Sequence, residues 1–400
     1  MPTLEARMSN EALIVAAVRT PIGKAPRGSL RHTRPDDLAA LAIQAVLARC
    51  PALDPAEIED VIMGCATPEG EQGLNIARVA ALRAGLPHST PGATVNRFCA
   101  SGLEAIAIAA ERIRAGDAEV ILAGGVESMS RTPFLDIHSH PNPTLFHHAP
   151  NTYLNMGLSV EQLARKHGVT REQADAFALQ SHQRAVRAQD EGLLDAEIAP
   201  VTTELQSLDA HGRPQRETIT LTRDEGPRRD TSLESLAKLK PAFRADGLIT
   251  AGNASQRSDG AAAVLVMSER KANALGLQPL LRFVGYTTAA LAPEDFGVAP
   301  AYAIPKLLKR VGVSIADIAH IEFNEAFAAQ VLASNKIFEM PMERVNPYGG
   351  AIALGHPLGC TGARQAATLA YALQRTGGRY GLITMCAALG MGAAGLFERV

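Results

Sequence analysis

The chain has 400 residues, of which 46% are hydrophobic and 20% charged, and its formal net charge at pH 7 is −2. This composition is that of a globular protein with enough apolar mass for two or three domains. The small net charge excludes a global basic surface for nucleic acid or for an anionic membrane. Any anionic ligand must therefore be bound by local cations.

The cysteines and the apolar runs indicate the compartment. Five cysteines are scattered without paired spacing, which argues against a disulfide framework and against structural zinc. Residues 1–10 lack the apolar run of an export signal, and no apolar run approaches the roughly 20 residues that span a membrane. We therefore expect a cytoplasmic protein without membrane segments.

Short apolar strands alternate with helices from the N-terminus onward. Residues 12–18 (ALIVAAV) and 60–64 (DVIMG) predict strands, Pro35 stands at the first turn of a predicted helix, and residues 119–125 (EVILAGG) predict a further strand. Strands that are apolar throughout are typical of a sheet covered on both faces. The alternation predicts an α/β fold.

Residues 131–247 differ in character, because His and Pro crowd their first part and charged residues their second. We interpret them as an inserted loop domain, and long insertions tend to be functional. The capping-box patterns SVEQ and TREQ predict helices that begin near residues 160 and 171. Histidines between 138 and 148 have loose metal-ligand spacing, but no carboxylate or cysteine completes the pattern, so a solvated loop is favoured over a zinc site.

The order of segments in the first part recurs after residue 280. The paired positions are 13 with 280, 61 with 321, 95 with 345 and 120 with 381, which gives offsets of 267, 260, 250 and 261. Such similar offsets predict duplicated half-domains, with two generic α/β runs as the alternative. The predicted division is a first half at 1–130 plus 248–278, the inserted loop domain at 131–247 and a second half at 279–400.

Cys99 directly precedes a predicted buried helix that ends at Gly116. A helix N-terminus stabilises a thiolate, and a lowered pKa is what makes a cysteine reactive. Cys99 is therefore a candidate nucleophile, with packing as an equally good interpretation. His356 is the candidate base, because glycines on both sides of it allow close backbone approach.

Two further candidates stand at strand ends. Cys386 ends an apolar strand and is followed by a loop of small residues, which places a thiol where substrate can reach it. Asn324 ends another strand and could hold a catalytic water through its side-chain amide. For Cys50, Cys65 and Cys360 we favour packing over function.

Five stretches of the chain together resemble the thiolase family, in the family's own order and over essentially the whole length. They are VNRFCASGLEA, TAGNASQRSDGAAA, NEAFA, GGAIALGHPLGCTGAR and CAALGMG. The resemblance implies an α/β thiolase fold of two duplicated βαβαβαββ halves in five α-β-α-β-α layers, with an inserted loop domain. It also implies a homodimer or homotetramer.

The resemblance assigns roles to the candidate residues. Cys99 is the expected nucleophile that carries the acyl group as a thioester, His356 the base that activates it, and Cys386 the acid/base at the acetyl Cα. Asn324 is expected to hold a water that forms one oxyanion hole with His356. The backbone N–H groups of Cys99 and Ala388 are expected to form the other.

The resemblance also implies how coenzyme A is bound. Arg228 is expected beside the adenine, Ser255 near the pantetheine and Met156 beside the acyl pocket. Coenzyme A is a substrate here, and neither a cofactor nor a metal is expected. The chain departs from the family in two places: Ala388 stands where Cys-x-Gly is typical, and Phe98 where Gln is common. The first departure preserves a backbone N–H, and the second changes the shape of the pocket.

The expected activity is that of an acetyl-CoA C-acyltransferase, which cleaves 3-ketoacyl-CoA with CoA or condenses acyl-CoA with acetyl-CoA. TSLESLAKLKPAF and NMGLSVEQLARKHGV favour degradative use on medium or longer chains over acetoacetyl-CoA synthesis. A β-oxidation partner subunit would fit this use. The alternatives are a ketoacyl synthase, which NEAFA and Cys386 disfavour, and a non-catalytic acyl-CoA or lipid-binding protein.

Overall fold

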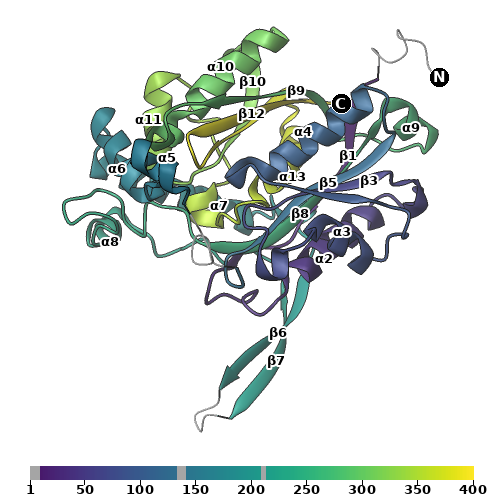
Figure 1. Cartoon of the computed structure of the whole chain (residues 1–400), viewed down its shortest axis with the longest axis horizontal. Helices are drawn as coiled ribbons and strands as arrows, with labels where there is room; N and C mark the ends of the chain where they lie inside the picture. The colour runs from purple at the N-terminus through teal and green to yellow at the C-terminus, as the bar shows by residue number, and fades with distance from the viewer. Residues whose placement is uncertain (1–9, 133–140, 209–212) are drawn as a thin grey trace.

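The computed structural model describes residues 10–132, 141–208 and 213–400 (Figure 1). Ten strands form one mixed sheet in the order β10-β11-β12-β9-β1-β8-β5-β3-β4, with β2 paired to the start of β8. They are β1 (Ala12–Arg19), β2 (Gly23–Lys24), β3 (Asp60–Gly64), β4 (Gly92–Val95), β5 (Val120–Ser128), β8 (Ser258–Ser268), β9 (Leu281–Ala290), β10 (Ile318–Phe323), β11 (Tyr380–Ala387) and β12 (Met391–Arg399).

The sheet consists of two halves with the same pairing pattern. In the first half β4, β3 and β5 are parallel, and β8 and β1 follow antiparallel. In the second half β10 and β11 are parallel, and β12 and β9 follow antiparallel, while Val345 forms a parallel bridge to Ile321 in the place of β4. Leu13 and Ile14 of β1 pair with β9 and join the halves. The predicted duplication and its pairing of segments are confirmed.

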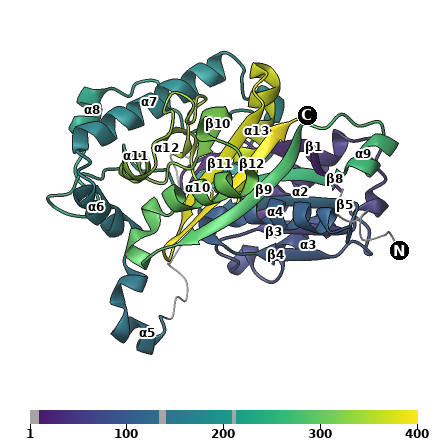
Figure 2. The same ribbon diagram turned by 90° about the horizontal axis from the view of Figure 1, so that it is seen from above.

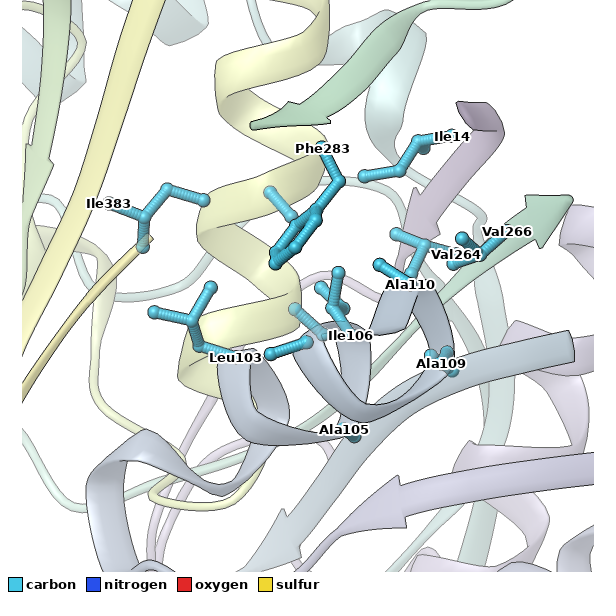
Figure 3. Packing of buried hydrophobic residues seen from close by; sticks show 14 of the residues in the cluster. Ile14, Leu103, Ala105, Ile106, Ala109, Ala110, Val264, Val266, Phe283 and Ile383 are labelled. Carbon is cyan, nitrogen blue, oxygen red and sulfur yellow. The ribbon is translucent and has the colours of Figure 1, made fainter. Parts of the chain in front are cut away.

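The two halves of the sheet are two layers of the fold, and helices form the other three (Figure 2). Helices α2 (Pro35–Ala48) and α3 (Ile76–Arg83) cover the first half, and α10 (Pro300–Val311) and α11 (Ala328–Ile337) cover the second. Helices α4 (Ser101–Arg114) and α13 (Thr361–Thr376) pack between the halves, where Leu103 and Ile106 of α4 meet Phe283 of β9 and Ile383 of β11 (Figure 3). This is the predicted five-layered α/β fold.

Helices α4 and α13 approach each other at two equivalent glycines. A Cβ on Gly102 would lie 2.7 Å from the O atom of Gly359, and a Cβ on Gly362 would lie 2.2 Å from the N atom of Leu103. Each glycine is the second residue of its helix. Because a side chain at either position would collide with backbone, the crossing fixes where both helices begin. It therefore fixes the segments that carry Cys99 and His356.

The region between β5 and β8 holds α5 (Pro143–His148), α6 (Met156–Lys166), α7 (Arg171–Asp190), α8 (Leu233–Ala237) and a hairpin of β6 (Val201–Leu208) and β7 (Pro214–Leu221). The hairpin projects away from the body (Figure 1) and was not foreseen in the sequence. No described element settles the predicted boundaries at 131 and 247, which stay a prediction.

The two helix starts predicted in this region had different outcomes. Helix α7 begins as predicted, because Thr170 and Gln173 form a capping box. The prediction for α6 is wrong by about one turn, since Asn155 caps this helix by accepting the N–H of Gly157. Ser159 of the SVEQ pattern is buried inside α6, so it is not a cap.

Two observations concern membranes and metals. None of the helices within the described ranges has the length and apolar character needed to cross a membrane. Likewise, the described side chains include no group of three His, Cys, Asp or Glu residues that could hold a metal ion. His138 and His140 lie outside the described residues.

Candidate active site

A cavity of about 220 Å³ brings together residues that lie far apart in the sequence. Cys99 reaches it from a single turn of 3₁₀ helix just before α4, and His356 from the loop between α12 (Ala351–Leu354) and α13. Cys386 reaches it from β11. Ser255 and Met156, predicted to contact the pantetheine and the acyl group, line the same cavity.

The hydrogen bonds of His356 define its tautomer. Thr361 Oγ1 donates to the O atom of Pro357 at 2.9 Å and lies 2.6 Å from His356 Nδ1. Since the hydroxyl proton is already used, Nδ1 carries the ring proton and donates it to Thr361. Nε2 is then the unprotonated nitrogen, and Asn324 Nδ2 donates to it at 3.2 Å. This arrangement gives His356 a nitrogen that can accept a proton.

Burial sets the protonation state of the imidazole. Burial, together with the positive charge of Arg364 on α13, lowers the pKa of His356 to about 3. The backbone of His356 is held by its N–H, which is shared between Ser258 Oγ and the O atom of Gln256. His356 is therefore neutral near pH 7 and fixed in place, as a general base must be.

The two thiols are both protonated in this environment. Burial raises the pKa of Cys99 to about 12, although its own backbone N–H lowers it. Burial also raises the pKa of Cys386, and the nearby Cys99 adds to this rise. The expectation that the helix N-terminus lowers the pKa of Cys99 is thus wrong, because the loss of solvation outweighs the N–H groups. For either thiol to act as a nucleophile, a base would have to remove its proton.

Asn324 directly follows β10, as predicted, and its backbone N–H donates to the O atom of Thr384 on β11. Its side chain is fully buried. While Nδ2 donates to His356, Oδ1 has no hydrogen-bond partner among the described residues. A buried amide oxygen without a partner is costly, so this atom is suited to accept a hydrogen bond from a water molecule.

The two departures from the family pattern can now be placed. Ala388 follows β11, and the positive φ angles come after it, at Leu389 (62°) and Gly390 (83°). The backbone at Ala388 therefore does not require glycine. Phe98, immediately before the nucleophile candidate, has a φ of 49°. A bulky side chain in this region of φ is uncommon, and no sequence pattern predicts it here.

Arg228 lies outside the cavity of Cys99, in a neighbouring hollow of about 170 Å³. His182 and Asp230 line this hollow with it, and the backbone N–H of Arg228 donates to His182 Nδ1 at 3.2 Å. Gln256 lines both hollows, so they adjoin at this residue. The exposed Arg228 thus stands beside a second compartment that leads toward Ser255.

Glu127 is a buried residue at this site that the sequence analysis missed. Its carboxylate accepts the N–H of Ala66 at 2.8 Å, the N–H of Gly359 at 2.8 Å and the side-chain amide of Gln72 at 2.6 Å. Burial raises the pKa of Glu127, and these hydrogen bonds oppose the rise. Glu127 joins the loop after β3 to the loop of His356. The one feature of the sequence that could have predicted its role is an acidic residue standing alone in the apolar run VILAGGVES.

The rest of the cavity wall is mostly apolar and was also missed. It is contributed by separate segments, which no spacing in the sequence connects. These residues are Met129, Phe243, Ala254, Phe296, Ala326, Phe327 and Leu358. The remaining cysteines, Cys50, Cys65 and Cys360, are buried in apolar clusters away from this wall, as packing residues would be.

Comparison with known proteins agrees with this geometry. Residues 12–270 match the thiolase N-terminal domain, and residues 277–399 match the thiolase C-terminal domain. A 3-ketoacyl-CoA thiolase of Bacillus subtilis is 47% identical over 97% of this chain and 99% of its own length.

Two crystal structures are similar over nearly the whole chain. One is a Bacillus anthracis acetyl-CoA acetyltransferase, with 40% identity and a TM-score of 0.89 over 98% of this chain and 99% of the other. The second is human mitochondrial 3-ketoacyl-CoA thiolase, with 36% identity and a TM-score of 0.88 over 98% of this chain and all of the other. With two domain models covering nearly its entire length, the chain belongs to the thiolase family.

Proposed function

We propose that the protein is an acetyl-CoA C-acyltransferase of the 3-ketoacyl-CoA thiolase type, which uses CoA to cleave 3-ketoacyl-CoA into acetyl-CoA and a shortened acyl-CoA. The observation that carries the proposal is the meeting of Cys99, His356 and Cys386 in one mostly apolar cavity. Two thiols and a neutral imidazole fit a reaction that needs a nucleophile, a base and a second proton carrier.

In the first step His356 Nε2 accepts the proton of Cys99, and the thiolate attacks the C3 carbonyl of the substrate. The C2–C3 bond then breaks, which leaves the shortened acyl group on Cys99 as a thioester and acetyl-CoA as its enolate. Cys386 donates its proton to the enolate carbon, and acetyl-CoA is released. CoA, deprotonated by Cys386, attacks the thioester and releases the acyl-CoA, and Cys99 leaves as a thiolate that regains its proton from His356. The buried, high-pKa thiol of Cys386 is suited to protonating an enolate carbon.

Both oxyanions of this reaction need donors. A water on Asn324 Oδ1, together with His356, would bind the enolate oxygen, and the unpaired state of that amide oxygen supports the assignment. The backbone N–H groups of Cys99 and Ala388 would bind the oxyanion formed at the thioester. Ala388 is suited to this because its backbone φ is compatible with any residue.

Coenzyme A would enter through the hollow of Arg228, with its pantetheine arm passing Gln256 and Ser255 toward Cys99. The adjoining position of the two hollows supports this path. Met156, at the start of α6, would contact the acyl group. The exposed Arg228 supplies a cation for the phosphates of the nucleotide.

A biosynthetic thiolase that makes acetoacetyl-CoA is the alternative, and the acetyl-CoA acetyltransferase among the similar structures favours it. Three phenylalanines and two methionines on the cavity wall favour a longer acyl group. The presence of both thiols and the base argues against a non-catalytic acyl-CoA-binding protein.

We further propose a homodimer or homotetramer. Leu74 is 98% exposed and Leu82 of the neighbouring α3 is 42% exposed, and apolar surface of this kind is typical of an interface. The β4 edge of the sheet follows α3 in the chain and offers unpaired backbone groups.

All five cysteines are free thiols, which fits the cytoplasm. Association with a β-oxidation subunit stays a prediction.

Thiolysis assays test the proposal. The purified protein is mixed with CoA and acetoacetyl-CoA or 3-ketohexanoyl-CoA, and the loss of enolate absorbance is followed. We expect turnover with both substrates and a higher kcat/KM with the longer one. Failure to cleave any 3-ketoacyl-CoA would reject the proposed function, and turnover of acetoacetyl-CoA alone would favour the biosynthetic alternative.

A further inference from the structure

The wall of the cavity that holds Cys99 carries one permanent positive charge. This charge is Arg257, which lines the cavity together with Ser255. The next residue in the chain is Ser258, whose Oγ accepts the N–H of His356. No Asp or Glu is found among the described residues of the wall. An arginine therefore faces an otherwise uncharged, mostly apolar pocket.

Most donors of the Arg257 guanidinium are unused. Nη2 donates to the O atom of Met129 at 3.2 Å, and within the described ranges the group has no other side-chain hydrogen bond and no ion pair. Arg257 is exposed to solvent. Arg97 and Arg131 hold Glu104 and Glu71 through two hydrogen bonds each. Arg257 has a free fork of N–H donors where these residues have a carboxylate.

The backbone around Arg257 is held firmly in place. The side-chain amide of Gln256 donates to the O atoms of Gly226 and Ile352, both at 3.1 Å. The O atom of Arg257 accepts the N–H of Ala25 at 2.9 Å. These bonds fix the backbone of Arg257 at the edge of the cavity, and the bond from Nη2 to Met129 directs the guanidinium toward it. A guanidinium fork has the geometry that recognises carboxylates and phosphates.

The chemistry of the acyl chain determines whether the positive charge of Arg257 favours or opposes substrate binding. An acyl chain that reaches Arg257 at the edge of the cavity displaces part of the water around the exposed guanidinium, and a charge that loses water without gaining a partner is costly. A neutral alkyl chain provides no partner. A chain that ends in a carboxylate accepts two N–H bonds from the fork and neutralises the charge.

We propose that the acyl pocket takes 3-ketoacyl-CoA substrates whose acyl chain ends in a carboxylate, with Arg257 binding that carboxylate. This inference rests on the proposed function and narrows its substrate class. A phosphate of coenzyme A is the other anion available, but the nucleotide is assigned to the hollow of Arg228, and the long pantetheine arm separates its phosphates from the thioester. Arg257 shares its cavity with the three catalytic candidates instead.

The test compares 3-oxoadipyl-CoA with 3-ketohexanoyl-CoA, two six-carbon substrates that differ in the terminal carboxylate. We expect the wild-type kcat/KM to favour 3-oxoadipyl-CoA, and R257L to lower this ratio by about 10-fold to 100-fold, the range for a charge-assisted hydrogen bond. R257K, which keeps the charge but loses the fork, should lie between. R270L, on exposed α9 (Glu269–Ala274), should leave the ratio unchanged.

The outcomes separate this inference from the proposed function. Wild-type protein that cleaves 3-ketohexanoyl-CoA but shows no preference for 3-oxoadipyl-CoA would overturn the inference alone. Equal losses with both substrates in R257L, together with a raised KM for CoA, would also overturn it and assign Arg257 to a phosphate. Wild-type protein that cleaves neither substrate would reject the proposed function itself.

Discussion

The two halves of the molecule share one architecture and supply different chemistry. Helix α4 in the first half and α13 in the second begin at equivalent places and cross at Gly102 and Gly362. The segment before α4 carries the thiol of Cys99, and the segment before α13 carries the imidazole of His356. A duplicated scaffold thus brings two helix starts to one cavity, and the side chains that differ there are the proposed nucleophile and its proposed base.

The halves differ most in how their functional side chain is held. His356 is fixed through Thr361, Asn324 and Ser258, which leaves one ring nitrogen unprotonated. Within the described ranges Cys99 has no comparable set of side-chain partners, and burial keeps it protonated. In the proposed mechanism the second half therefore activates the first.

Replacing the base should have the largest effect. H356N removes the proton acceptor and should lower kcat for thiolysis by roughly 10²-fold to 10⁴-fold, the range for general-base catalysis. T361V retains the base and loses only the acceptor that fixes its tautomer, so its loss should be smaller. Steady-state kinetics of both purified variants provide the check. Equal activity of H356N and wild type would show that Cys99 is activated by another group.

Breaking the link between the halves should have the next largest effect. E127Q removes the carboxylate that joins Ala66 to Gly359, and small displacements of reacting groups can cost up to about 10²-fold in rate. We expect acetylation of Cys99 by acetyl-CoA to slow by roughly 10-fold or more in rapid-quench experiments.

E325Q is the matched control for this prediction. Glu325 is also buried, and it binds Ser181, Asn346 and the N–H of Ile352, all outside the first half. Its loss should lower the free energy of unfolding without a comparable effect on acetylation. Equal slowing of acetylation in both variants would mean that Glu127 contributes only general stability.

A side chain placed at the crossing of α4 and α13 should lower the free energy of unfolding. G362A places a methyl group against the backbone of Leu103, and such overpacking typically lowers the free energy of unfolding by about 1–3 kcal/mol. E111A, on the exposed side of α4, should change it by less than about 0.5 kcal/mol. Urea unfolding followed by circular dichroism measures both. A G362A variant as stable as E111A would contradict the close crossing of the two helices.

Mild acid should destabilise the protein through His356. Its pKa is about 3 when folded and about 6.5 when unfolded, so the unfolded state binds more protons as the pH falls below 6.5. Stability is therefore lost in this direction. Between pH 7 and pH 5 the wild type should lose about 2 kcal/mol more of its free energy of unfolding than H356N. An identical loss in both proteins would mean that His356 is not buried in its neutral form.

The sequence revealed much of this organisation. Alternating strands and helices and the recurring spacing predicted the two halves, because period and order are local properties. Cys99, His356, Cys386 and Asn324 could be proposed from the sequence because each stands next to glycines or at an element boundary. Glu127 and the apolar wall were missed, since their roles arise from contacts between distant segments.

The pKa of Cys99 shows a different limit. A position before a helix predicts a lowered pKa, but the degree of burial depends on the whole fold and reverses the direction. Arg257 was likewise visible in TAGNASQRSDGAAA, yet only the cavity around it reveals that its charge lacks a partner.

The two thiols divide the roles of acyl carrier and proton carrier in the proposed mechanism, and intact-protein mass spectrometry tests this division directly. C386S exposed to acetyl-CoA should still gain one acetyl group at Cys99, while its thiolysis activity falls by orders of magnitude, because a hydroxyl is a far poorer acid and base than a thiol. C99S should gain none and lose both half-reactions. A folded C386S protein that fails to be acetylated would contradict the assignment of the acyl carrier to Cys99 and of proton transfer to Cys386.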